Sequence, residues 1–286
     1  MKTRRIADVE VNAIGLGGMP MSIEGRPDEA RSIATIHAAL DEGVSLIDTA
    51  DAYSLDAGDF GHNESLFAKA VASWGGDTSQ VLVATKGGHL RSGDGSWTVD
   101  GRPDYLKSAA EASLKRLGGE AIGLYQFHRP DPQVPYADSV GALRDLLDAG
   151  TIRLAGISNA SPEQIRVAQE ILGGRLASVQ NQFSPAFRSS EPELELCDEL
   201  GVAFLPWSPL GGIKSAAALG DRFAPFQQVA DARGLSPQVV SLAWHLAKSP
   251  HVIPIPGASR PESIRDSVQA TDVTLTAEEM AALDAA

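Results

Sequence analysis

Short apolar segments alternate with helix-start signals along the 286-residue chain, and this alternation restricts its fold more than any other feature. Each segment has the length of a buried strand, and glycine, proline or a capping residue separates it from its neighbours. Ser161-Pro162-Glu163-Gln164 has the pattern of a capping box with proline at the first helical position, and similar signals occur at Asp28, Ser236 and Thr276. Parallel strands joined by crossover helices are expected from this pattern. The expected strands centre on Leu16, Leu46, Val83, Leu124, Ala155, Val179, Phe204 and Val252.

Eight strands with intervening helices predict an α/β fold of the (β/α)8 TIM-barrel class, built by residues 1–286 as one domain. Residues 5–11 alternate around a tight turn at Ala7-Asp8 and predict a β-hairpin that closes the barrel floor. An open doubly wound sheet is the alternative, because residues 15–18 are rich in glycine like a Rossmann fingerprint. Pro20 occupies the third glycine position of that fingerprint, however, and no helix follows at once.

Polar side chains follow three successive predicted strands. Asp48 and Tyr53 follow the strand centred on Leu46, Lys86 follows the next strand, and His128 follows the one after that. An open sheet would not place functional side chains at so many consecutive strand ends, whereas a barrel collects all of these ends on one rim. We therefore expect these four side chains to form one site.

The order and spacing of these four residues resemble the catalytic tetrad of the aldo-keto reductase superfamily. The resemblance covers nearly the whole chain, because further motifs of that family follow in family order. They are Gly61-His62-Asn63-Glu64, Gly156-Ile157-Ser158-Asn159, Gln180, Trp207-Ser208-Pro209-Leu210 and Ile255-Pro256-Gly257-Ala258-Ser259. The resemblance implies an enzyme that reduces an aldehyde or ketone to an alcohol with a nicotinamide cofactor, bound across the barrel mouth without a Rossmann domain.

The four residue types suit this reaction. A free tyrosine, with a pKa of about 10, is a reluctant proton donor, and a nearby ammonium group is expected to lower that pKa. Lys86 would provide the ammonium group, Asp48 would hold it charged, and Tyr53 would then act as the general acid. His128 would donate a hydrogen bond to the substrate oxygen. Lys86 could instead form a Schiff base in a barrel aldolase, but that needs a lysine with a lowered pKa, and Asp48 acts in the opposite direction.

The resemblance also implies the cofactor contacts. Ser158, Asn159 and Gln180 match positions that hydrogen-bond the carboxamide, and Trp207 falls where an aromatic ring stacks on the nicotinamide. The pyrophosphate loop corresponds to Ser208, Leu210 and Gly212, whose glycine allows backbone N–H groups near phosphate oxygens. The adenosine-phosphate segment corresponds to Gly257, Ser259, Arg260, Ser263, Asp266 and Ser267.

These residues predict a preference for NADP(H), with NAD(H) as the alternative. Arg260 and Arg265 flank the start of a helix, and both cations and the helix N-terminus favour a phosphate group. The chain departs from the family at positions 263 and 267, where serines replace the arginine or glutamine and the asparagine often found there. Met19 and Trp97 are expected to line the pocket for a small carbonyl substrate, whose identity the motifs leave open.

Composition limits the other functions. The net charge of −13 argues against a nucleic-acid partner, and no apolar run is long enough to span a membrane. The only cysteine, Cys197, excludes an intrachain disulfide and suits the reducing cytoplasm. The six histidines show no pair at ligand spacing, so no metal is expected. We expect a monomer or a weak homo-oligomer. The remaining alternative is a cofactor-binding regulatory subunit with slow redox turnover.

Overall fold

A curled parallel sheet lies at the centre of the protein. The computed structural model describes residues 2–286. Its main sheet has seven strands in the order β11-β10-β9-β8-β5-β4-β3, and every neighbouring pair is parallel. The strands are β3 (Leu16–Gly17), β4 (Leu46–Asp48), β5 (Leu82–Gly87), β8 (Ile122–Phe127), β9 (Ile152–Ser158), β10 (Leu176–Gln180) and β11 (Ala203–Phe204).

Residues 252–257 close this sheet into a barrel. They are bridged to β11 through Phe204 and Val252, and to β3 through Gly17 and Gly257. On the β3 side, the N–H groups of Gly15 and Gly17 donate to residues 254 and 256, both prolines, with N···O distances of 3.0 Å. All eight predicted strand centres therefore lie around one closed barrel, which confirms the (β/α)8 prediction and excludes the open sheet.

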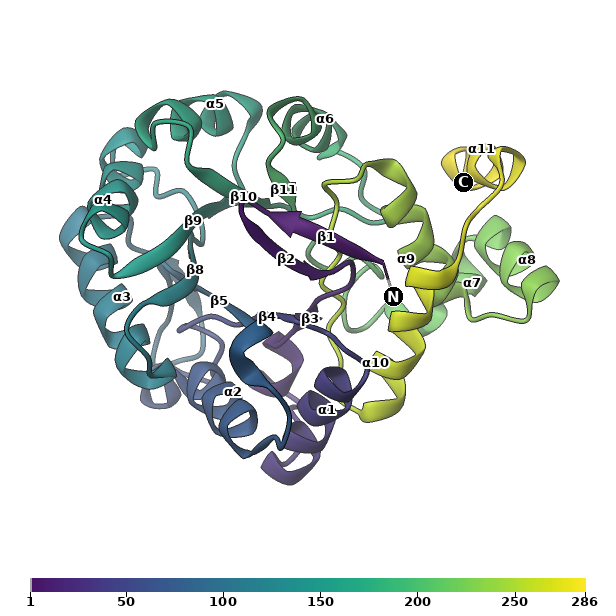
Figure 1. The fold of residues 1–286 in the computed structure, drawn as a ribbon, viewed down its shortest axis with the longest axis horizontal. Coiled ribbons are helices and arrows are strands. Elements are labelled where there is room, and N and C mark those ends of the chain that lie inside the picture. The colour runs from purple at the N-terminus through teal and green to yellow at the C-terminus, as the bar shows by residue number, and fades with distance from the viewer. Residues whose placement is uncertain (1) are drawn as a thin grey trace.

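A ring of helices covers the outside of the barrel (Figure 1). The helices of the ring are α1 (Glu29–Asp41), α2 (His62–Ser73), α3 (Pro103–Leu117), α4 (Tyr136–Asp148), α5 (Pro162–Ile171), α6 (Glu191–Leu200), α9 (Pro237–Lys248) and α10 (Pro261–Val268). Figure 1 shows α7 (Leu219–Arg222), α8 (Ala224–Arg233) and α11 (Ala277–Asp284) grouped outside this ring, beside α9. Short 3₁₀ turns are η1 (Met19–Met21), η2 (Ala57–Asp59), η3 (Thr78–Gln80), η4 (Ala216–Ala218) and η5 (Gln269–Asp272).

The helix starts follow the sequence signals. Ser161 and Thr276 each form a complete capping box, in which side chain and backbone satisfy each other's hydrogen bonds. The side chains of Asp28 and Ser236 accept hydrogen bonds from the first turns of α1 and α9. Each such cap stabilises a helix by about 0.5–2 kcal/mol. These local contacts fix where the crossover helices begin and hence how long the connecting loops are.

The N-terminal hairpin closes the lower end of the barrel. It pairs β1 (Thr3–Ile6) with β2 (Val9–Asn12) around a turn in which Ala7 has a φ of 52°. The buried side chains of Ile6 and Val11 belong to the same apolar cluster as the inward-facing residues of the barrel strands. Figure 1 shows the hairpin lying across the barrel axis. The predicted floor is therefore confirmed, and it leaves the opposite rim open to a ligand.

Hydrogen bonds connect two loops at that rim. The segment from Gly87 to Arg102 contains an unpredicted antiparallel hairpin, β6 (His89–Arg91) with β7 (Trp97–Val99). Arg91 is buried and donates to the backbone oxygens of residues 54 and 55 in the neighbouring loop, at 3.1 and 3.0 Å. It also pairs with Glu24. These contacts give the rim a fixed wall.

Candidate active site

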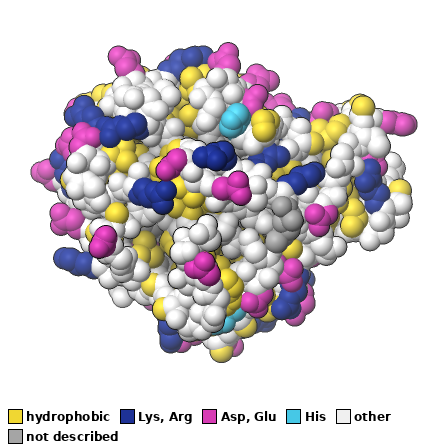
Figure 2. Space-filling view, viewed as in Figure 1, with side chains coloured by type: hydrophobic (Ala, Val, Ile, Leu, Met, Phe, Trp, Pro, Cys, Tyr) yellow, Lys and Arg dark blue, Asp and Glu magenta, His cyan; other side chains and the backbone are white. Residues whose placement is uncertain are grey.

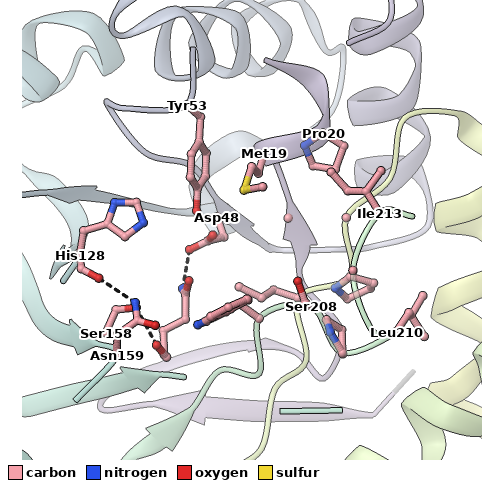
Figure 3. A pocket seen from close by; sticks show the side chains of 18 of the residues that line it. Met19, Pro20, Asp48, Tyr53, His128, Ser158, Asn159, Ser208, Leu210 and Ile213 are labelled. Atoms are coloured by element: carbon pink, nitrogen blue, oxygen red, sulfur yellow. Dashed lines mark hydrogen bonds between the residues drawn. The ribbon is translucent and has the colours of Figure 1, made fainter. Parts of the chain in front are cut away.

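A cavity of about 480 Å³ opens at the carboxyl ends of the barrel strands. Clefts of this size typically hold small ligands and occur at this face of (β/α)8 barrels. Of the predicted residues, it is lined by Met19, Asp48, Tyr53, Trp97, His128, Ser158, Asn159, Gln180, Trp207, Ser208, Leu210, Gly212 and Gly257. In Figure 3, Tyr53 and His128 lie across the cavity from Leu210 and Ile213.

Lys86 lies behind Tyr53 and joins it to Asp48. Its side chain is fully buried, and its Nζ donates to Asp48 Oδ2 at 2.6 Å and to the Thr49 carbonyl oxygen at 2.7 Å. The third contact is to the Tyr53 hydroxyl at 3.2 Å. All three donor positions of the ammonium group are therefore directed at oxygens, and one of these oxygens is the phenol that reaches the cavity.

The second carboxylate oxygen of Asp48 also accepts hydrogen bonds. Gln180 Nε2 donates to Asp48 Oδ1 at 2.8 Å, and Gln126 Nε2 approaches the same oxygen at 3.4 Å. The main-chain oxygen of Gln180 in turn accepts a 2.6 Å hydrogen bond from Ser158 Oγ. Three strands, β8, β9 and β10, thus fix the orientation of the carboxylate. Gln126 was not predicted, although it precedes His128 by two residues and so extends along the same face of β8.

Burial and neighbouring charges together set the pKa values of Lys86 and Tyr53. Burial is the largest single effect on Lys86 and would lower its pKa. The charge of Asp48, the Tyr53 phenol and the hydrogen bonds to both side chains together outweigh burial and raise that pKa, so the ammonium stays charged. The pKa of the Tyr53 phenol is also raised, because burial outweighs the opposing charge of Lys86. Lys86 does lower the pKa of Tyr53, as the sequence predicted, but the larger effect of burial makes the net shift upward. The phenol is fully protonated at neutral pH.

His128 faces Tyr53 with its ring edge. The ring centroids are 5.6 Å apart and the planes lie at 80°. Burial, followed by the charge of Lys86, lowers the pKa of His128 well below its ordinary value, so the imidazole is neutral. Its Nδ1 is buried and has no hydrogen-bond partner among residues 2–286. Asn159, at a φ of 55°, donates from Nδ2 to the His128 carbonyl oxygen at 3.0 Å (Figure 3).

A second acid lies close to this site and was also not predicted as part of it. Asp51 is fully buried, and its carboxylate oxygens lack hydrogen-bond partners of normal geometry within the described chain. Burial, with the neighbouring charge of Glu64, raises its pKa well above the usual range, and Arg116 only partly offsets this. Arg116 is paired with Glu64, which also accepts from Thr85 Oγ1. Burial therefore disfavours the charged form of Asp51 beside the Lys86–Tyr53 pair.

Five predicted cofactor residues lie outside the cavity, beyond Gly257, around the start of α10. Arg260 precedes Pro261 as the N-cap residue, and its Nε donates to Ser263 Oγ at 2.9 Å. Ser267 Oγ donates to the Ser263 carbonyl oxygen at 2.9 Å, which places both serines along one side of the helix. Asp266 accepts from Ser236 Oγ at the start of α9. The fifth residue, Ser259, immediately precedes Arg260.

Two charged or titratable residues of the lining were missed. His89 and Arg129 both line the cavity, and each follows a strand that carries a predicted catalytic residue. Their positions directly beyond the ends of β5 and β8 were a usable signal, because short extensions of barrel strands stay at the rim. Pro20 and Ile213 complete the apolar side opposite His128.

Within residues 2–286, no three His, Cys, Asp or Glu side chains are arranged to hold a metal ion. None of the helices in that same stretch has the length and apolar character needed to cross a bilayer. Figure 2 shows acidic and basic side chains interspersed over the visible face, with no continuous basic stripe.

Known proteins resemble this chain over its full length. The model of the aldo/keto reductase family matches residues 13–286. A Schizosaccharomyces pombe protein named "Uncharacterized oxidoreductase C215.11c" is 32% identical over 286 residues, covering 99% of this chain and 89% of that protein. A Glycine max protein named "Probable aldo-keto reductase 1" is 31% identical over 299 residues, covering 95% and 84% of the two chains.

Solved structures agree in fold. A thermostable aldo-keto reductase, Tm1743, crystallised with the inhibitor epalrestat, superposes with a TM-score of 0.83 at 28% identity, covering 100% of this chain and 99% of that one. A glycerol dehydrogenase from Gluconobacter oxydans, AKR11B4, also gives a TM-score of 0.83, at 30% identity and with 99% and 94% coverage.

Proposed function

Because the chain belongs to the aldo/keto reductase family, we propose that it reduces an aldehyde or ketone to the alcohol with NAD(P)H. One observation carries the proposal: the protonated Tyr53 hydroxyl reaches the cavity while a buried, charged Lys86 donates a hydrogen bond to it at 3.2 Å. Carbonyl reduction needs such a proton donor at the oxygen, together with a hydride delivered to the carbon. We further propose that residues 1–286 act as one cytoplasmic reductase domain, as a monomer or a weak homo-oligomer.

The cavity side formed by Trp207 and the loop that follows it suits a dinucleotide. Trp207 lines the cavity, and its Nε1 is buried with no partner in the described chain. The indole offers a flat face to a planar ring. Gly211 and Gly212, with φ values of 83° and 94°, leave backbone open to an approaching phosphate. Bound there, the nicotinamide would supply the hydride.

The chain's own residues would handle the proton. Tyr53 Oη gives its proton to the carbonyl oxygen as the carbon is reduced, and the charge of Lys86 stabilises the phenolate that remains. Asp48 keeps Lys86 charged and in place through the 2.6 Å contact. The neutral imidazole of His128 adds a hydrogen bond to the same oxygen, which fixes the carbonyl beside the tyrosine. In alcohol oxidation the phenolate acts as the base.

Steady-state turnover tests this function against the two alternatives. NADPH absorbance is followed with a panel of aldehydes and ketones, and we expect carbonyl-dependent oxidation of NADPH. A regulatory subunit would bind NADPH without turnover. A Schiff-base aldolase would give a stable adduct on Lys86 after borohydride treatment, whereas a lysine held charged by Asp48 should give none. Either of those results contradicts the reductase proposal.

NADPH is proposed as the preferred cofactor, with Arg260 as the main contact to the 2′-phosphate. This side chain lies at the start of α10, where the free N–H groups of the first turn also favour an anion. Arg265 lies one turn further and points its Nε at Glu42, 3.6 Å away. It therefore serves as a matched control on the same helix.

Arg260→Ala is expected to weaken NADPH binding by about tenfold or more, because a charge-assisted contact contributes about 1.5–3 kcal/mol. NADH binding should change far less, and Arg265→Ala should keep most of the NADPH preference. Fluorescence titration with both cofactors measures this. Equal losses for NADH and NADPH in Arg260→Ala, or a wild-type preference for NADH, would show that the phosphate pocket has been misassigned.

A further inference from the structure

Arg129 is a half-buried arginine of the cavity wall that lacks an acidic partner. It directly follows His128 and lines the cavity with it. No acidic side chain of residues 2–286 forms an ion pair with it. The nearest acid in sequence, Asp131, accepts hydrogen bonds from the backbone N–H groups of residues 101 and 133 instead. A guanidinium partly removed from water and left unpaired is costly, unless a ligand completes its hydrogen bonds.

The charge of Arg129 reaches the catalytic end of the cavity. Burial is the main cause that lowers the pKa of His89 to about 4, and Arg129 is the next. Arg129 also contributes to the lowered pKa of His128, after burial, Lys86 and His89. Both imidazoles are therefore neutral at physiological pH. Among the described side chains of the lining, Arg129 is left as the one with a permanent positive charge.

A wall of rings connects this end of the cavity to its mouth. His128 meets His89 edge to face, with centroids 4.9 Å apart, and His89 stacks on Trp97 at 4.6 Å. Trp97 is backed by the guanidinium of Arg91, 4.2 Å from its ring, but that arginine is already paired with Glu24. A substrate on this wall thus meets flat, neutral rings and one free cation.

We propose that Arg129 binds an anionic group of the carbonyl substrate, a carboxylate or a phosphate ester, and so selects acidic aldehydes and ketones. The inference rests on the proposed reductase function, since it places the carbonyl at Tyr53. The planar guanidinium donates two parallel hydrogen bonds to such oxyanions, which fixes orientation as well as affinity. His128, which precedes Arg129 in the sequence, lies across the cavity from Leu210 and Ile213 (Figure 3). We therefore assign the anion to the substrate and not to the cofactor.

Two substrate pairs that differ in charge test the proposal. Terephthalaldehydic acid is compared with its methyl ester, and glyceraldehyde phosphate with glyceraldehyde, so that carboxylate and phosphate are separated. Wild type should prefer the charged member of at least one pair. Arg129→Gln should lower the charged-to-neutral ratio of kcat/KM by about tenfold or more, mainly through KM, while the KM for NADPH stays unchanged. Arg129→Lys should retain part of the preference.

The control is Arg166→Gln, which removes the same charge from an exposed position on α5. It should leave both ratios unchanged, which excludes general steering by the protein's field. Thermal unfolding of each variant checks that it folds. An unchanged charged-to-neutral ratio of kcat/KM in Arg129→Gln contradicts the proposal, whether or not the KM for NADPH rises.

A binding measurement separates this inference from the proposed function. Benzoate and benzamide are titrated into wild type and Arg129→Gln by calorimetry, which needs no turnover. Tighter binding of benzoate that disappears in Arg129→Gln supports the anion site even if no carbonyl is reduced. Turnover of the neutral substrates with neither a benzoate preference nor a preference for the charged member of either substrate pair leaves the reductase function intact and overturns the role of Arg129.

Discussion

Tyr53→Phe is expected to lower kcat for carbonyl reduction by about 10²–10⁴-fold, the usual contribution of a general acid. The substitution removes only the hydroxyl that Lys86 contacts at 3.2 Å, and the ring can keep its edge-on contact with His128. The NADPH dissociation constant should therefore change little. Stopped-flow reduction with saturating NADPH measures the chemical step, and fluorescence titration measures the cofactor affinity.

Tyr136→Phe is the matched control for this experiment. Its hydroxyl is buried on α4 without a hydrogen-bond partner inside the described range, and it does not line the cavity. Removing it should leave turnover unchanged. If Tyr53→Phe retains turnover close to wild type, another group supplies the proton and the role proposed for Tyr53 is wrong.

Lys86→Met is expected to destabilise the fold by about 3–5 kcal/mol and to abolish turnover. The lysine and Asp48 side chains are 0% and 4% exposed, so removing the ammonium leaves a buried carboxylate without its counter-charge. The phenolate formed at Tyr53 would also lose its stabilising charge. Urea denaturation monitored by circular dichroism gives the free energy of unfolding, and steady-state assays give the activity.

The double variant Lys86→Met, Asp48→Asn separates the charge effect from packing. Because neither buried charge remains, it should be more stable than Lys86→Met alone while staying inactive. The exposed pair between Arg153 and Asp8 provides the comparison. Arg153→Met should cost no more than about 1 kcal/mol. A double variant no more stable than Lys86→Met would show that lost packing, and not an unpaired charge, destabilises it.

The sequence determined the fold where local signals were strong. The capping boxes at Ser161 and Thr276 and the apolar strand centres depend on neighbouring residues, so they could be predicted without tertiary information. The hairpin of residues 89–99 could not, because Trp97 is held there by Arg91, which is itself anchored to a different loop. The extra helices α7 and α8 carry no catalytic motif and have no counterpart in a simple strand-helix repeat.

In the site, too, some features could be predicted from the sequence and others could not. The positions of Asp48, Tyr53, Lys86 and His128 around one rim follow from strand order alone. The direction in which the pKa of Tyr53 shifts does not follow from the sequence. Burial and the charge of Lys86 change this pKa in opposite directions, and only the folded structure shows that the effect of burial is larger. The cavity position of Arg129 also depends on how the chain leaves β8. Its place directly after His128 indicates the rim, but not whether the side chain points into the cavity or into solvent.

The prolines of the closing strand have a consequence for synthesis of the chain. Residues 252–257 are synthesised after the seven strands of the main sheet, which until then have unpaired edges at β3 and β11. Pro254 and Pro256 have no N–H, and they accept from Gly15 and Gly17 without donating in return. The same strand edge is therefore a poor template for a strand of another molecule, because half of the usual ladder is missing. Once residues 252–257 have paired with β11, the edge that they present toward β3 offers few N–H donors to a strand of a neighbouring chain.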